Sequence, residues 1–277
     1  MIPTVEARGR FTGPVFVLRR FLDRAIETGH LLEMQPRLQT SDEDAHPMIR
    51  LCGHDLKPLA EGALWWAAQK TLIVSDLHLE KGSSFARAGQ HLPPYDTRTT
   101  LALIRRLIGE LKPERVISLG DSFHDPRAHE RLPAEDWEAI CALTHQLDWI
   151  WVEGNHDPDP PEGLGGTPSK EFRLGRLIFR HEPTGETGEI SGHLHPCARL
   201  MGRGNKMVRR RCFITNGNSL ILPSMGAFTG GLNVLEPVYQ PLFPTGMKVF
   251  MTGTDRVYAI PTSRLVGDRL QKARWRL

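Results

Sequence analysis

The sequence predicts an α/β fold, with a parallel sheet in the first half of the chain and mostly antiparallel sheet in the second. From residue 70 onward, apolar strand-like segments alternate with segments of helical periodicity. After residue 172 only short strand-like segments follow one another. Strands that alternate with helices pair in parallel through right-handed crossovers. In such sheets, functional groups collect at the carboxyl ends of the strands.

The first half contains three expected strands and two expected helices. The first helix has its apolar positions on one face, and Asp96 or Thr97 is expected as its N-cap. The second helix opens with Pro133 and has acidic residues in its first turn. The expected strands are TLIVSD (71–76), RVISLGD (115–121) and DWIWVEGNHD (148–157), and the helices are 97–112 and 133–147.

The second half contains six expected short strands. The turn TGTD (252–255) is expected to join the last two as a hairpin. The six segments are 176–181, 189–195, 211–216, 219–224, 247–253 and 256–260.

Three regions are expected along the chain. Residues 1–47 form an appendage, with an amphipathic helix around residues 18–26 and a polar linker after it. Residues 48–262 form the main domain, and residues 263–277 form a basic C-terminal tail.

The composition limits the class of protein. The chain has 277 residues, of which 40% are hydrophobic and 24% charged, as in ordinary globular proteins. No apolar run approaches the roughly 20 residues that a membrane-spanning helix needs, so we expect no membrane partner. The four cysteines are widely spaced and include no Cys-x-x-Cys pair. This spacing favours a cytoplasmic location and argues against a thiolate zinc site.

Residues of metal-binding type stand at the end of five expected strands. Each alone has a plain alternative: Asp-x-His is typical of a capping Asp beside a surface His, Gly-Asp of a turn, and a lone His of a satisfied core residue. Five such strand ends in one chain indicate a common site. The residues are Asp76 and His78, Asp121, Asn155 with His156 and Asp157, His181, and His193 with His195.

The ordered set DLH, GDSFH, GNHD, His181 and GHLH resembles the calcineurin-like metallophosphoesterase superfamily. Within it, residues 76–97 are similar to the bacterial ligase-associated DNA damage response endonucleases. The resemblance implies a four-layer α/β/β/α fold, a two-sheet β-sandwich flanked by helices.

The resemblance also implies two divalent metal ions. It assigns Asp76, His78 and His195 to one ion and Asn155, His181 and His193 to the other, with Asp121 bridging them. Manganese is expected chiefly by resemblance, although iron or zinc also suit a mixture of imidazole and oxygen ligands. His156 is expected as proton donor or transition-state stabiliser, with Asp157 orienting its ring, and His124 as a substrate contact at the rim.

The favoured function is phosphodiester cleavage in nucleic acid during DNA repair, with DNA ligase and helicase as partners by resemblance. Hydrolysis of a small nucleotide or other soluble phosphoester is the alternative within the class, and a non-catalytic scaffold is the alternative outside it. Bacterial UDP-diacylglucosamine pyrophosphohydrolases of the same superfamily have a GNRD pattern at the third motif. This chain has GNHD there, with His156 in place of the Arg. The difference argues against the lipid-precursor reaction.

Basic residues gather in the second half of the chain. From Ile190 to Leu235 there is no Asp or Glu, and GRGNKMVRRR (202–211) has the glycines of a mobile loop. We expect Arg209, Arg210 and Arg211 to contact nucleic acid from a flexible arm near the site. The alternative is a solvated basic loop without a binding role.

Overall fold

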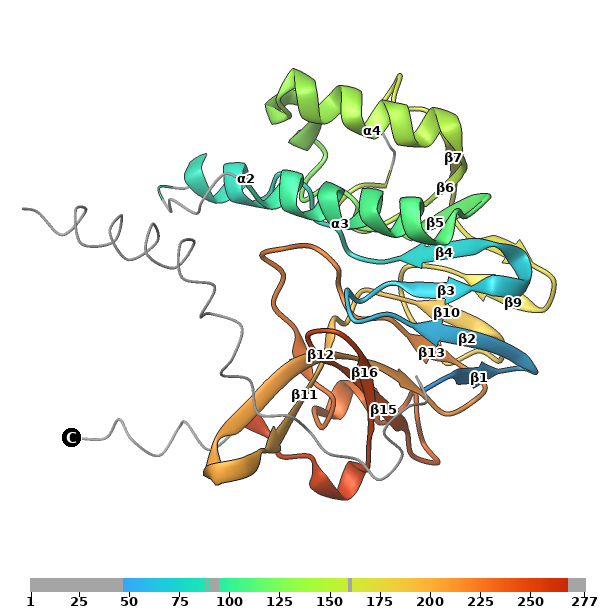
Figure 1. Cartoon of the computed structure of the whole chain (residues 1–277), viewed down its shortest axis with the longest axis vertical. Helices are drawn as coiled ribbons and strands as arrows, with labels where there is room; N and C mark the ends of the chain where they lie inside the picture. The colour runs from blue at the N-terminus through green and yellow to red at the C-terminus, as the bar shows by residue number, and fades with distance from the viewer. Residues whose placement is uncertain (1–46, 88, 90–94, 159–160, 269–277) are drawn as a thin grey trace, which may run out of the picture. The chain divides into compact units, whose positions relative to one another are not determined.

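Two mixed β-sheets pack against each other, and α-helices lie on the other side of the first sheet (Figure 1). The structure is a computed structural model, and it describes residues 47–268 except 88, 90–94 and 159–160. The expected helix near residues 18–26 and most of the basic C-terminal tail lie outside the described residues. The α/β fold with two packed sheets is confirmed.

The first sheet contains the predicted parallel strands. β4, β5, β6 and β7 pair in parallel, and β1 to β4 extend the sheet by antiparallel pairing. In order across the sheet, the strands are β1 (Ile49–Leu51), β2 (His54–Pro58), β3 (Leu64–Trp66), β4 (Thr71–Val74), β5 (Arg115–Leu119), β6 (Asp148–Val152) and β7 (Thr167–Ser169). The connecting helices are α2 (Lys81–Arg87), α3 (Asp96–Leu111) and α4 (Ala134–Gln146).

The second sheet contains nine strands. β15 (Lys248–Thr252) and β16 (Val257–Ile260) form the predicted hairpin, with Thr252 opposite Val257. β15 pairs with β12, and β9, β10 and β13 pair in parallel. The other strands along the sheet are β14 (Leu232–Asn233), β11 (Pro196–Met201), β12 (Met207–Thr215), β13 (Leu220–Ile221), β10 (Glu189–Ser191), β9 (Leu177–Phe179) and β8 (Phe172–Leu174).

Two hydrophobic layers hold these parts together. Along β4, Ile73 is buried between the two sheets, whereas Leu72 and Val74 are buried beneath the helices. Successive side chains of a strand point to opposite faces, so a strand covered on both sides is apolar throughout. In the described residues, α-helices cover the first sheet, and only short 3₁₀ helices accompany the second.

The predicted N-cap of α3 is wrong, because neither Asp96 nor Thr97 caps that helix. Tyr95 occupies the cap position and makes no side-chain cap bond. Asp96 instead accepts a hydrogen bond from the backbone N–H of Gly82 at 2.9 Å, and the Thr97 hydroxyl accepts one from the N–H of Glu80 at 2.9 Å. These bonds anchor the start of α2, a helix that the sequence did not predict, directly after Asp76 and His78.

The prediction of a flexible basic arm is also wrong. Arg209, Arg210 and Arg211 lie within β12, which pairs with β11 so that Arg209 stands opposite Arg199. Residues 263–268, assigned to a tail from the sequence, contact the sheet through a bridge between Leu265 and Leu200.

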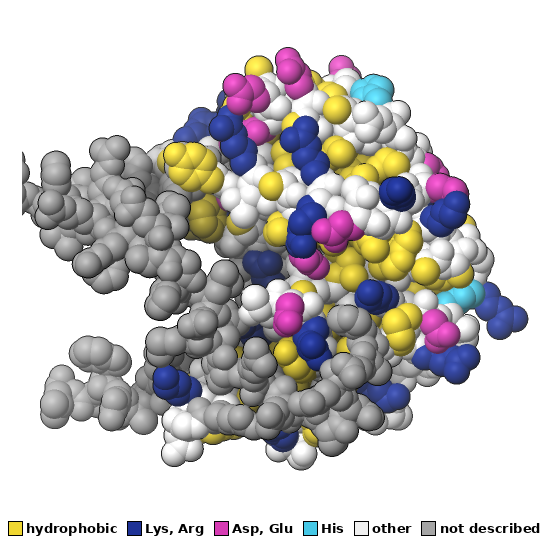
Figure 2. Space-filling view, in the orientation of Figure 1, with side chains coloured by type: hydrophobic (Ala, Val, Ile, Leu, Met, Phe, Trp, Pro, Cys, Tyr) yellow, Lys and Arg dark blue, Asp and Glu magenta, His cyan; other side chains and the backbone are white. Residues whose placement is uncertain are grey.

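Charged side chains are dispersed on the face drawn in Figure 2. Over the described residues visible there, Lys and Arg are interspersed with acidic and apolar side chains. The chain has a net charge of +3, but its basic side chains form no single patch on that visible face. No helix among the described residues is long and apolar enough to cross a membrane.

Candidate metal centre

The loops that follow five strands bring the predicted ligands together. Asp76 and His78 follow β4, Asp121 follows β5, and Asn155 follows β6. From the second sheet, His181 follows β9, and His193 and His195 follow β10. The site is therefore built where the carboxyl ends of strands from both sheets meet.

The ligand pairs reach the site through left-handed backbone, which corrects one sequence prediction. The expected strands 71–76 and 189–195 placed Asp76, His193 and His195 in extended backbone. β4 ends at Val74, however, and Asp76 and His78 have φ values of 51° and 43°. Asp121, His193 and His195 also have positive φ. Residues with a Cβ rarely adopt such backbone conformations. Those that do are concentrated at functional sites, where the surrounding structure enforces the conformation.

The first group of ligands consists of Asp76, His78 and His195. Their ligand atoms all lie within 4.8 Å of one another. Nε2 of His195 is 3.1 Å from Oδ1 of Asp76 and 3.3 Å from Nε2 of His78. Ser75 and His193 orient the Asp76 carboxylate, since the Ser75 hydroxyl and the His193 backbone N–H both donate to its Oδ2.

The second group consists of His181, His193 and Asn155. Nε2 of His181 is 2.9 Å from Oδ1 of Asn155 and 3.1 Å from Nδ1 of His193. Nδ1 of His181 lies 2.8 Å from the carbonyl oxygen of Leu119. A proton on Nδ1 bonded to that carbonyl leaves the Nε2 lone pair facing the site, the arrangement typical of a metal-binding histidine.

Asp121 stands between the two groups. Its Oδ2 is 3.7 Å from Nε2 of His78 in the first group, and its Oδ1 is 3.4 Å from Nε2 of His181 in the second. Together with His181 and His193 it forms a second cluster of potential metal ligands within 4.8 Å. One carboxylate thus has an oxygen for each group, as a bridging ligand requires.

The electrostatics give Asp121 and His78 the form that binds metal. Burial raises the pKa of Asp121, but the hydrogen bond and the charge of His181 outweigh burial and lower that pKa to about 2. Burial lowers the pKa of His78 to about 3. Ionised carboxylates and neutral imidazoles are the forms that coordinate metals. Burial lowers the pKa of His181, but the carboxylates of Asp121 and Asp76 outweigh burial and raise that pKa to about 9. The two carboxylates therefore favour a positive charge at this position.

Glycines let the loops approach this closely. A Cβ at Gly192 would overlap Ser75 Oγ and lie 2.5 Å from Oδ2 of Asp76. A Cβ at Gly154 would overlap the backbone nitrogen of Asp121 and lie 2.5 Å from Oδ1 of Asp157. The residues present thus fit a two-ion site both in donor chemistry and in packing.

His156 and His124 form a wall beside the first group. Their rings stack at 5.6 Å with an interplanar angle of 16°, and the His156 ring lies 5.3 Å from that of His78. The side chain of His156 is 44% exposed, so a substrate can reach it. Phe85 lies 6.0 Å from the His124 ring, with the Lys81 ammonium 5.9 Å above Phe85.

Asp157 does not orient the His156 ring, contrary to the sequence prediction. Its Oδ2 accepts a hydrogen bond from the backbone N–H of Phe123 at 2.9 Å, and its Oδ1 has no hydrogen-bond partner among the described residues. Burial raises the pKa of Asp157 to about 7. The carboxyl group therefore holds the loop that carries Asp121, while His124 stacks on the imidazole of His156.

Sequence reasoning missed the segment 224–231, which supports the ligand backbone. The N–H groups of Met225 and Gly226 donate to the carbonyls of Ser75 and Asp76, at 2.8 and 3.1 Å. The N–H of Leu232, directly after the segment, donates to the carbonyl of His195 at 3.1 Å. The glycines of SMGAFTGG (224–231) were the available signal, because they permit such close backbone contacts.

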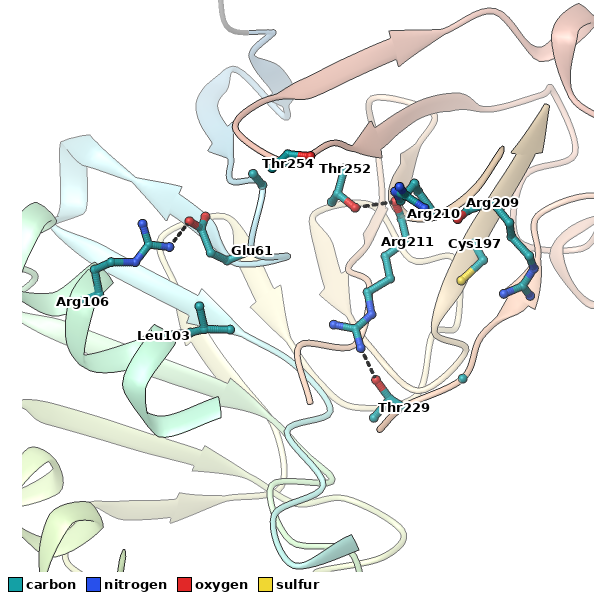
Figure 3. Close-up of a pocket in the computed structure, with 12 residues that line it drawn as sticks. Glu61, Leu103, Arg106, Cys197, Arg209, Arg210, Arg211, Thr229, Thr252 and Thr254 are labelled. Atoms are coloured by element: carbon teal, nitrogen blue, oxygen red, sulfur yellow. Dashed lines mark hydrogen bonds and ion pairs between the residues drawn. The ribbon is translucent and has the colours of Figure 1, made fainter. Parts of the chain in front are cut away.

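Two of the arginines predicted to contact nucleic acid bind this segment. The guanidinium of Arg211 donates to the carbonyls of Met225 and Gly226. It also donates to the hydroxyl of Thr229 (Figure 3). Arg209 donates to the carbonyl of Gly231 at 2.6 Å. Arg210 is exposed, and its guanidinium donates to the carbonyl of Arg209.

Fold and site define a phosphoester hydrolase with a candidate metal centre. The family model for calcineurin-like phosphoesterases matches residues 69–220, and the chain belongs to that family. The chain is 30% identical to the Pseudomonas putida nuclease MPE, with a TM-score of 0.61, over 78% of this chain and 100% of that one.

A second structural match is more distant. Yfce, a phosphoesterase from E. coli, is 15% identical, with a TM-score of 0.33, over 71% of this chain and 96% of that one. Comparison with curated proteins gives no match.

Proposed function

We propose that the chain is a nuclease that hydrolyses phosphodiester bonds in DNA with two divalent metal ions. The observation that carries this proposal is the similarity to the nuclease MPE, which extends over the whole of that protein. The two ligand groups and Asp121 between them support the two-ion part.

Asp76, His78 and His195 would hold one ion, and Asn155, His181 and His193 the other, with Asp121 shared. When bound, the ions supply a water nucleophile at neutral pH and neutralise charge on the phosphoryl oxygens. Imidazole with carboxylate and amide oxygen suits manganese, iron or zinc better than calcium, and manganese is proposed chiefly by resemblance to the family.

The remaining side chains act on the substrate. His156 would give a proton to the leaving alkoxide, a role that its accessible ring beside the first ligand group supports. His124 keeps that ring in one orientation by stacking against it. Asp157 supports both, because it binds the backbone between Asp121 and His124. We place this reaction in DNA repair in the cytoplasm, where a DNA ligase and a helicase would act on the same DNA.

The test is a substrate panel with the full-length protein and Mn²⁺. Linear and single-stranded DNA, RNA, bis(p-nitrophenyl) phosphate and p-nitrophenyl phosphate are compared by kcat/KM. Asp121→Asn, purified in the same way, controls for contaminating nucleases. DNA should be cleaved with the highest kcat/KM. Efficient hydrolysis of the small esters without DNA cleavage would overturn the DNA assignment and favour a small soluble phosphoester.

A further inference from the structure

A pocket of about 510 Å³ lies between the loop after β2, helix α3 and strands β11 and β12 (Figure 3). Arg106 from α3 lines one side, and Arg209, Arg210 and Arg211 from β12 line the other. Glu61 is the one acidic residue among its lining residues. The pocket thus brings four arginines together with one acidic residue.

The arginines in this pocket differ in how far they are already engaged. Arg211 donates to two carbonyls and a hydroxyl. Arg106 pairs with Glu61 and lies 3.7 Å from Glu110. Arg209 lies 3.5 Å from Asp268. In the described part of the chain, the guanidinium of Arg210 has only the carbonyl of Arg209 as acceptor. Because a guanidinium has five N–H donors, most donors of Arg210 remain available to bind an anion.

The segment 224–231 lines the pocket and also supports the loop that carries the metal ligands. Thr229 and Gly230 line the pocket. In the same segment, the N–H groups of Met225 and Gly226 donate hydrogen bonds to the carbonyls of Ser75 and Asp76. Gly226 fits so closely against Leu77 that a Cβ there would overlap the Leu77 carbonyl oxygen. The segment that lines the pocket is therefore the one that contacts the ligand loop.

We propose that this pocket is a phosphate subsite, which binds the backbone of the nucleic-acid strand at a position remote from the bond cleaved at the metal centre. The inference rests on the proposed function, because only a polyanionic substrate spans both sites. Arg210 is the principal donor, and Arg106 contributes when Glu61 releases it. A guanidinium matches the geometry of a phosphate with two parallel N–H bonds. A small phosphoester bound at the metal centre does not extend past segment 224–231 and gains nothing from the subsite.

The experiment measures DNA affinity of the full-length protein by fluorescence anisotropy in EDTA over a series of salt concentrations. Removal of divalent ions leaves the cationic side chains as the source of affinity. Arg210→Ala should weaken duplex binding roughly three- to tenfold and reduce the log–log salt slope by about 0.9. Arg210→Lys keeps the charge and should recover most of the slope. Glu61→Gln should strengthen binding, because it removes the nearer of the two carboxylates that engage Arg106.

Arg176→Ala is the matched control. Arg176 is exposed in the turn between β8 and β9, at the opposite edge of the second sheet from β11 and β14, so its loss removes the same charge elsewhere. It should change the salt slope much less than Arg210→Ala does. An equal effect of the two substitutions, or no strengthening by Glu61→Gln, would overturn the subsite.

Failure of the subsite and failure of the proposed function give different results. If the wild-type protein cleaves DNA in Mn²⁺ but Arg210→Ala keeps wild-type affinity and slope, only the subsite is wrong. If the wild-type protein neither binds nor cleaves DNA, both are wrong. If Arg210→Ala loses hydrolysis of bis(p-nitrophenyl) phosphate in proportion to DNA affinity, the substitution acts on the metal centre and the subsite is rejected.

Discussion

The backbone N–H of His156 donates a hydrogen bond to Oδ1 of Asp121 across 2.9 Å. Oδ2 of the same carboxylate lies 3.9 Å from Nε2 of the His156 ring. The proposed bridging ligand, Asp121, and the proposed proton donor, His156, are therefore joined directly by a hydrogen bond. Metal content must be measured alongside activity, because displacement of either residue moves the other.

Asp121→Asn tests the bridge. The amide keeps an oxygen that can accept the His156 N–H, so the loop should remain folded, while the negative charge between the two ligand groups is lost. We expect metal content to fall and the rate to drop by more than about 100-fold, since supporting residues alone cost up to that much. Elemental analysis and steady-state kinetics measure both. Wild-type turnover with two bound ions would contradict the assignment.

A thermal melt provides an independent measurement for the same variant. Ions that bind only the folded protein stabilise it by about 2.7 kcal/mol at 100 times their Kd. Added Mn²⁺ should therefore raise the Tm of the wild-type protein and have a much smaller effect on Asp121→Asn.

His156→Ala separates proton transfer from metal binding. His156 is not among the proposed ligands, so metal content should stay near wild type. Hydrolysis of a dinucleotide should fall by roughly 100- to 10,000-fold, because its alkoxide needs a proton. A nitrophenyl ester needs none, so its rate should fall less. Equal losses on both substrates would indicate charge stabilisation in place of acid catalysis.

Gly192→Ala tests the packing of the ligand loops. The added Cβ would displace Ser75 Oγ and the Asp76 carboxylate. A shift of about 1 Å at such groups can cost about 100-fold in rate. Gly109→Ala in α3 is the control, since a Cβ there meets no atom within 4 Å and should stabilise the helix by up to about 1 kcal/mol. Measurement of kcat and Tm for both variants checks the prediction, which is wrong if Gly192→Ala keeps full activity.

Arg211→Ala tests the support of segment 224–231. Loss of hydrogen bonds from a charged donor to Met225, Gly226 and Thr229 should lower the unfolding free energy by roughly 2–4 kcal/mol. Mn²⁺ affinity should fall as well, because this segment holds the carbonyls of Ser75 and Asp76. Arg211→Lys should not restore either property, since one ammonium does not reproduce the fork of a guanidinium. Denaturant melts and metal titration measure the two effects, and unchanged Mn²⁺ affinity would limit Arg211 to a stabilising role.

The sequence was sufficient for the parts of the protein that depend on local pattern. The apolar segments around Ile73, Ile117 and Ile150 predicted β4, β5 and β6, because strands covered on both faces are apolar throughout. Their ends carried the site, since a carboxylate or imidazole after such a strand has no packing reason to be there. The metal-binding residue types were visible for that reason before any contact was known.

The tertiary structure decided how those residues are held, because the contacts join distant parts of the chain. His78 and His195 are 117 residues apart, and Nε2 of each lies 3.3 Å from that of the other. The left-handed backbone at Asp76 and His78 is enforced by surrounding contacts that no local spacing encodes. Arg211 has the same charge as Arg210, yet the pairing of β12 turns it toward segment 224–231. Charge is a property of the residue, whereas the acceptor that a charge meets is fixed only when the strands have packed.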